Sequence, residues 1–183
     1  MATEVANIAG FYADHNSTGA TTITGPVLVV YKHGAYLFLQ DKSGVLIVKG
    51  KIDKKLKRGD LLEGVTGEYE AAGGVANMVN PVSDSIKVVG QEKAPKPKNV
   101  SLAKITKRMH GTYVKIKDVE VKAGKKEYFY SLKDENGVKM TMLDRFRLKQ
   151  LPVGQNCDVT GFVMVSPKGN IVLNATKVEM VEE

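Results

Sequence analysis

The chain has 183 residues, 43% of them hydrophobic, and a formal net charge of +7. This length suits one large domain or two small ones. The most apolar stretch, 27–31, is far shorter than the ~18 to 20 residues of a membrane helix. The N-terminus lacks a basic leader followed by an apolar core, so neither a secretory signal nor membrane insertion is expected.

The first half begins with a short helical segment and continues as strands. A helix is expected over 3–12, with Thr3 as its N-cap. A long strand over 21–31 follows, bent at Gly25-Pro26. Next come a hairpin of 35–40 and 45–49 around an Asp-x-x-Gly turn, a strand ending at Thr66-Gly67, and a final strand over 85–89.

A spacer rich in proline and lysine separates the two halves. Pro95 and Pro97 remove backbone donors and favour extended neighbours, while interleaved lysines keep the segment solvated. We therefore predict a helix plus a first barrel over 1–90, a linker over 91–100, and a helix plus a second barrel over 101–183.

The second half repeats the order of the first. A helix is expected over 101–108, capped by Ser101, and then a long strand from Val114 to Lys122. The alternation of that strand slips by one residue at Asp118, as a β-bulge would produce. A hairpin of 127–133 and 138–143, a strand ending at Thr160-Gly161 and a strand over 171–178 complete the half.

Matching turns at a spacing of 93 to 95 residues indicate an internal duplication. The turn Asp41–Gly44 corresponds to Asp134–Gly137, and the Thr-Gly pairs end corresponding strands. Long strand, hairpin, crossover and two more strands is the strand order of the OB barrel. The predicted fold class is mainly β: two tandem five-stranded OB-type barrels, each preceded by a short α-helix.

Two motifs carry a family resemblance: the hairpin Tyr36-Leu-Phe-Leu-Gln-Asp-Lys-Ser-Gly44, and Leu-x-x-Gly-Asp with Val-Thr-Gly over 56–67. Together they resemble OB-fold modules found singly or in tandem in bacterial secreted and surface-associated proteins, some joined to nuclease domains. The second half departs from the pattern, with Lys133 in place of Gln40. The resemblance implies nucleic-acid-binding-type OB domains. It also implies an extracytoplasmic location if the chain has lost a leader, and a cytoplasmic one otherwise.

No residue constellation is typical of catalysis. His15, His33 and His110 lack further ligands at metal-binding spacing, so loop or surface positions are expected for them. Cys157, the only cysteine, alternates with Val159 and is expected to be a buried structural thiol. We therefore expect a binding protein rather than an enzyme, with no cofactor and no metal site.

Positive charge gathers in the second half. Residues 1–90 hold 9 Lys/Arg and 9 Asp/Glu, whereas residues 101–183 hold 15 and 10, a net charge of +5 (15 − 10). OB barrels bind nucleic acid on the outward face of strands two and three with the flanking loops. Alternation places Phe129, Ser131, Lys133, Lys139 and Thr141 outward. The predicted nucleic-acid-binding residues are Phe129, Lys133, Lys139, Lys125 and Lys126; the alternative is a solvated sheet face without a ligand.

The first hairpin presents a different predicted face. If Leu37, Leu39, Val45 and Ile47 point inward, then Tyr36, Phe38, Leu46 and Val48 form an apolar outward patch, which is rare on a monomer unless protein covers it. The N-terminal helix, the sister barrel, a second copy or a protein partner could cover it. The second hypothesis is therefore an accessory or protein-interaction module of a larger secreted or surface-associated assembly.

Overall fold

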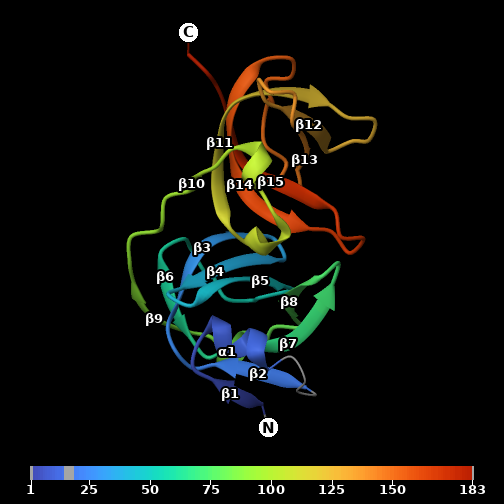
Figure 1. Cartoon of the computed structure of the whole chain (residues 1–183). Coiled ribbons are helices and arrows are strands. Elements are labelled where there is room, and N and C mark those ends of the chain that lie inside the picture. Colours follow the sequence, from blue (N-terminus) through green and yellow to red (C-terminus); the bar gives the residue numbers. More distant parts are fainter. Residues whose placement is uncertain (1, 15–18, 183) are drawn as a thin grey trace. The chain divides into compact units, whose positions relative to one another are not determined.

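The computed structural model describes residues 2–14 and 19–182. It is mainly β, with one short early helix, a curled sheet and a closed five-stranded barrel, which confirms the predicted fold class. The residues divide into two compact units, 1–71 with 76–95 and 72–75 with 96–183 (Figure 1). The two units are described separately below.

The first sheet has nine strands, in the order β1-β2-β7-β8-β5-β4-β3-β6-β9. Helix α1 spans Ile8–Ala13, and a 3-10 turn spans Ser83–Ser85. The strands are β1 (Thr3–Val5), β2 (Ala20–Ile23), β3 (Val27–His33), β4 (Tyr36–Asp41), β5 (Gly44–Lys49), β6 (Asp60–Glu63), β7 (Val65–Ala72), β8 (Val75–Val79) and β9 (Lys87–Gln91).

Two broken strands make this sheet curl. β2 and β3 are the two parts of the predicted first strand, bent at Gly25-Pro26, and β6 and β7 are separated by Gly64 alone. β2 pairs with β7 while β3 pairs with β6, so both bent strands follow the same curve. The parallel pairing of β5 with β8 gives the OB strand order.

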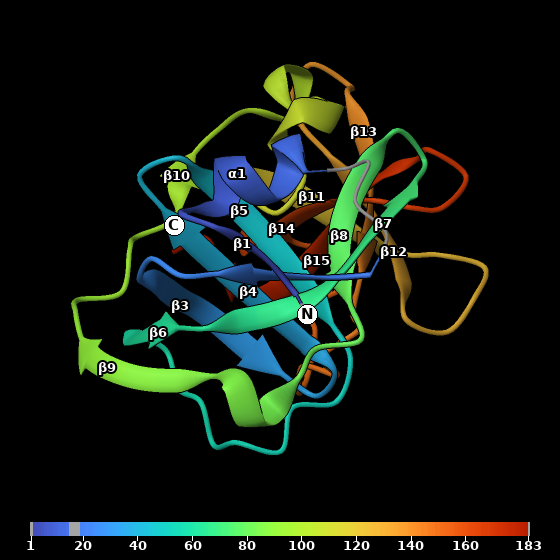
Figure 2. The ribbon, with the colours of Figure 1, turned by 90° about the horizontal axis from the view of Figure 1, so that it is seen from below.

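The last strand of the first half was misplaced in the sequence prediction. β8, not the segment 85–89, pairs with β5 in the position of a fifth barrel strand. β9, over Lys87–Gln91, instead runs beside β6 at the sheet edge, as Figure 2 shows. Val88 and Val89 are accordingly 48% and 49% exposed, because this added strand contributes little to the core.

The second barrel closes completely. Its five strands are β11 (Tyr113–Ala123), β12 (Phe129–Lys133), β13 (Lys139–Leu143), β14 (Asn156–Val165) and β15 (Ile171–Met180), and the short β10 (Lys98–Asn99) pairs with β11 outside the barrel closure. β11 pairs with both β12 and β14, and β13 pairs with β15 in parallel. The predicted bulge is confirmed: the β11–β14 register shifts between Ile116 and Val119, where Asp118 has a φ of 51°.

The helical lead-ins differ from the prediction. α1 begins at Ile8 and its N-cap is Asn7, whose Oδ1 accepts a 2.9 Å hydrogen bond from the Gly10 amide, while Thr3 lies in β1. The predicted helix over 101–108 is wrong. The segment instead forms two 3-10 turns, Leu102–Lys104 and Lys107–Met109. Ser101 makes no capping hydrogen bond with its side chain. The β-branched pair Ile105-Thr106 separates them in extended conformation, the backbone state that such side chains favour.

The facing of the first hairpin was also predicted wrongly for one strand. Leu46 and Val48 lie in the barrel core with Leu37 and Leu39, so they point inward. The turn between β4 and β5 has two residues, and it places Leu39 opposite Leu46 and Leu37 opposite Val48. Directly opposed residues share a face, so odd positions on β4 match even positions on β5.

Asp41 joins this hairpin to helix α1. Its Oδ1 accepts hydrogen bonds from the Ser43 amide at 2.7 Å and the Gly44 amide at 3.0 Å. Its Oδ2 accepts the Ile8 amide at 2.9 Å, at the first residue of the helix. Among the residues that the structure describes, the corresponding Asp134 accepts hydrogen bonds only within its own turn, from the Asn136 amide at 3.0 Å and the Val138 amide at 2.8 Å.

We predict that Asp41→Ala destabilises the protein more than Asp134→Ala does. Both changes remove the turn contacts, but only Asp41→Ala leaves the amide of the fully buried Ile8 without its acceptor. A buried donor left unsatisfied costs about 1–3 kcal/mol. Urea unfolding followed by circular dichroism measures the difference, and hydrogen exchange of the Ile8 amide should accelerate in Asp41→Ala alone. Equal effects of both variants would contradict the prediction.

Candidate nucleic-acid interface

The outward face of β12 and β13 has the side-chain orientation predicted for it. Leu132 and Met142 are fully buried in the barrel core, and Tyr130, Val138 and Met140 pack against it. Phe129 is 42% exposed, and Lys133 and Lys139 are exposed as well. The hairpin loop of five residues keeps parity between the strands, with Leu132 opposite Met140, which is why alternation assigned both strands correctly.

Lys133 and Lys139 lie directly opposite each other on this face. Like charges at such a position are destabilising, because their side chains start only ~4.5 to 5.5 Å apart. Glu120 lies opposite Lys133 on the other side, but its carboxylate forms a 3.2 Å ion pair with Lys122. Neither Lys133 nor Lys139 has an ion pair with another described residue. A bound anion would relieve this local repulsion.

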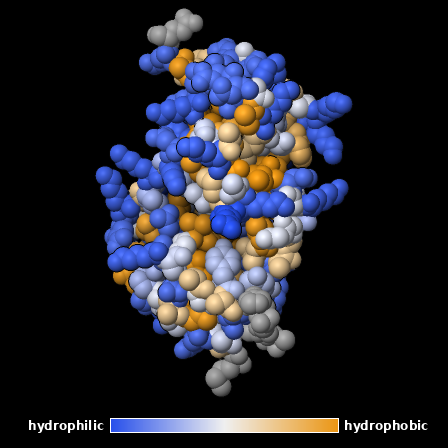
Figure 3. Space-filling model, viewed as in Figure 1, coloured by the Kyte–Doolittle hydropathy of each residue, from blue (hydrophilic) through white to orange (hydrophobic). Residues whose placement is uncertain are grey.

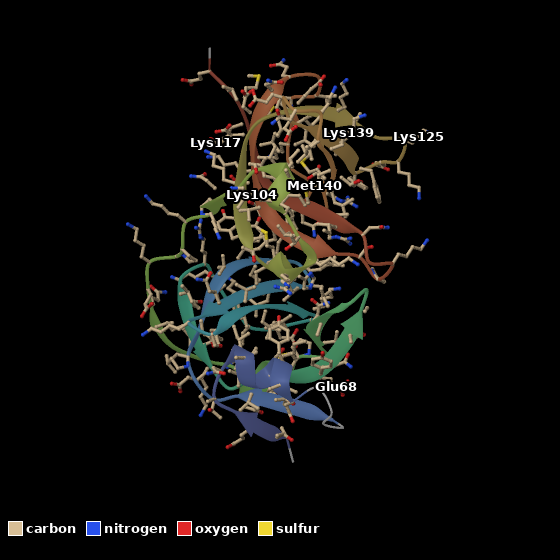
Figure 4. The ribbon with its side chains drawn as sticks, viewed as in Figure 1. Glu68, Lys104, Lys117, Lys125, Lys139 and Met140 are labelled. Atoms are coloured by element: carbon tan, nitrogen blue, oxygen red, sulfur yellow. The ribbon has the colours of Figure 1, made fainter. Side chains whose placement is uncertain are left out.

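The loop between β11 and β12 brings cations and aromatic rings together beside the face. The Lys126 ammonium lies 5.8 Å from the centre of the Phe129 ring. The Arg147 guanidinium lies 5.1 Å from the centre of the Tyr128 ring. Figure 4 labels Lys125 on this loop and Lys139 on β13 of the same barrel, and Figure 3 shows hydrophilic side chains projecting from this unit.

Tyr128 and Arg147 were missed by the sequence analysis. Tyr128 has a φ of 67°, an uncommon conformation for a residue with a large side chain, and such residues gather at ligand sites. A hydrogen bond to Glu127 raises the pKa of Tyr128 above that of a free tyrosine. Arg147 comes from the crossover between β13 and β14, and no local sequence pattern connects it with Tyr128.

Metal-binding clusters are not found in the described part of the chain. Across residues 2–14 and 19–182, no three His, Cys, Asp or Glu side chains come together as metal ligands would. Cys157 is buried, as predicted, and burial raises the pKa of its thiol, which disfavours the nucleophilic thiolate. Nor does any helix within those ranges have the length and apolar character to cross a membrane.

His110 lies in the turn that precedes β11, which fits the predicted loop position, but it is not a surface residue. It is 7% exposed, and its Nδ1 accepts a 3.0 Å hydrogen bond from the amide of the buried Val165. This contact requires an unprotonated Nδ1 and gives the ring a structural role. His33 is exposed, and His15 lies outside the described residues.

The predicted apolar patch on the first hairpin is not an exposed surface. Leu46 and Val48 belong to the core, Phe38 is 1% exposed, and Tyr36 is half-buried. Tyr36 and Phe38 do share the outward side, with stacked rings 6.3 Å apart. Tyr36 and Phe38 are therefore the two residues of the predicted patch that point outward, and their part in binding a protein partner stays a prediction.

No family model matches the chain, and no curated protein matches its sequence. Among solved structures, the crystal structure of the tetrameric p202 HIN2 is similar, with 13% identity and a TM-score of 0.44. The match covers 92% of this chain and 97% of that one. A second structure, described as "Structural mimicry for functional antagonism", has 14% identity and a TM-score of 0.43, with coverage of 90% and 96%. Neither match supports the bacterial or secreted origin that the family resemblance implied.

We predict that Lys139→Glu stabilises the second barrel. The change replaces the repulsion with Lys133 by an attraction, which is worth about 0.2–1 kcal/mol across a strand pair. Lys122→Glu is the matched control, because it breaks the ion pair with Glu120 and should destabilise the barrel. Thermal unfolding of the two variants and the unchanged chain gives the sign directly. Destabilisation by Lys139→Glu would show that the opposed lysines do not repel.

Proposed function

We propose that the chain is a non-catalytic binding protein. Its ligand is single-stranded nucleic acid, or a polyanion with a similar spacing of its charges, which binds to the outward face of the second barrel. The observation that carries the proposal is the exposed Phe129 on the same face as the directly opposed Lys133 and Lys139. Lys125 and Lys126 on the adjoining loop extend the positive charge past the aromatic ring.

Each part of this face has a counterpart in a single strand. A base stacks on the ring of Phe129, and the neighbouring phosphates interact with the lysines on both sides of it. Since Lys133 and Lys139 repel each other in the free protein, a phosphate between them removes an unfavourable interaction and adds a favourable one. Release of the counterions held by the strand adds to the affinity at low salt.

A single strand suits this face better than a duplex does. The bases of a duplex are stacked on one another, and their faces are not available to an aromatic side chain. Tyr128 precedes Phe129 in the chain and has the Arg147 guanidinium over its ring, which makes it a second candidate for stacking with a neighbouring base. Stacking of this kind tolerates all four bases, so little sequence preference is expected.

Fluorescence anisotropy with labelled single-stranded oligonucleotides tests the proposal. Phe129→Ala should weaken binding by about 1–3 kcal/mol, the contribution of one base stacked on an aromatic ring. Replacing Lys125 and Lys126 together by Ala should make the logarithm of the affinity fall less steeply with the logarithm of the salt concentration. Absence of binding to any single strand at low salt would overturn the proposal, because electrostatic attraction is strongest there.

The control is a change of equal charge in the first barrel. Lys55 and Lys57 are exposed and lie outside the second barrel, so replacing both by Ala lowers the net charge by the same amount. If the face of β12 and β13 is the binding site, the affinity of this control variant should depend on salt concentration in nearly the same way as that of the unchanged chain. Equal losses in the two double variants would indicate attraction to net charge without a defined site.

A further inference from the structure

The first barrel carries a cleft of about 590 Å³, a volume typical of small-molecule sites. Its floor is a row of three outward side chains on neighbouring strands: Gln40 of β4, Leu28 of β3 and Leu61 of β6. Leu28 lies directly opposite Gln40 on one side and Leu61 on the other. Leu28 and Leu61 are half-buried and lie outside the core cluster, so they form an apolar surface that faces the cleft.

The walls of the cleft are held by backbone contacts. On one side, the Ala6 carbonyl accepts a 3.0 Å hydrogen bond from the Gly25 amide, at a place where a Cβ on Gly25 would come within 2.3 Å of that oxygen. On the other side, the turn at Asp41–Ser43 is fixed by its own hydrogen bonds and by its contacts with α1. The cleft is therefore formed before any ligand enters.

Three polar groups of the cleft have no assigned partner. The Gln40 carboxamide makes no hydrogen bond with any described residue, and the Lys42 and Glu92 side chains form no ion pair with each other or with another described residue. The helix amides nearest the cleft are already satisfied, since Ile8 and Ala9 donate to Asp41 and Ser43. A ligand that matches these groups needs an apolar body for the leucine surface and an edge that forms hydrogen bonds with Gln40. It also needs an anion for Lys42 and a hydrogen-bond donor for Glu92.

We propose that this cleft binds a mononucleotide whose base is adenine. The base lies on Leu28 and Leu61, and its edge pairs with the Gln40 carboxamide, which matches the adjacent donor and acceptor of adenine. Guanine presents two acceptors on the same edge, so the amide can serve only one of them. The phosphate lies at Lys42, and the Glu92 carboxylate accepts hydrogen bonds from ribose hydroxyls, as acidic residues do in dinucleotide sites.

Isothermal titration calorimetry of the whole chain with AMP, GMP, adenosine and inorganic phosphate tests the site. AMP should bind saturably at one site, GMP and adenosine more weakly, and phosphate alone not at all. Gln40→Leu should weaken AMP binding at least about fivefold. Lys42→Met should weaken AMP binding about two- to fivefold and leave adenosine unchanged. Gln155→Leu, an exposed amide of the second barrel, is the matched control and should have no effect.

The outcome is independent of the proposed interface on the second barrel. AMP binding that persists in Phe129→Ala but falls in Gln40→Leu supports the cleft, whatever oligonucleotides do. AMP binding lost in Phe129→Ala and kept in Gln40→Leu would place the nucleotide on the second barrel and overturn the cleft. Absence of saturable AMP binding at millimolar concentration would overturn it as well.

Discussion

A five-stranded barrel of this order depends on the bending of its first strand, which must pair with the second strand along one part and the fourth along another. The chain meets this requirement in two ways. In the second barrel, the bulge at Asp118 lets β11 pair with β12 and β14. In the first, Gly25-Pro26 breaks the strand into β2 and β3, and Gly64 breaks the fourth strand to match. Strand order, core and outward faces follow from these bends.

The two halves share their strand order and turns but not their surfaces. Asp41 and Asp134 accept hydrogen bonds within the same kind of hairpin turn, but of the two only Asp41 also accepts one from a helix amide. The second hairpin places two lysines opposite each other on its outward face. The first hairpin places Gln40 beside a leucine there. The second barrel is therefore distinguished by a charged outward face, and the first barrel by an apolar cleft with few polar groups. The two surfaces suit different kinds of ligand.

The proposed interface tolerates an unfavourable contact that folding alone would not require. A threonine or glutamate at position 139 would fit β13 without repelling Lys133. We predict that this contact is destabilising, and an anion bound between the two lysines would relieve it. The strained Tyr128, with the Arg147 guanidinium over its ring, lies next to Phe129 and adds a second such feature.

The sequence by itself determined the fold class, the Asp-x-x-Gly turns, the bulge at Asp118 and the outward set on β12 and β13. These follow from local rules: alternation gives the face of a strand, and turn residues give its ends. Only the tertiary structure decided which side chains of β5 point inward, because the two-residue turn pairs odd-numbered residues of β4 with even-numbered residues of β5. The tertiary structure also decided that β8 is the fifth strand of the first barrel. The cleft of Gln40, Leu28 and Leu61 and the contact of Arg147 with Tyr128 also required the tertiary structure, because they join residues that are far apart in sequence.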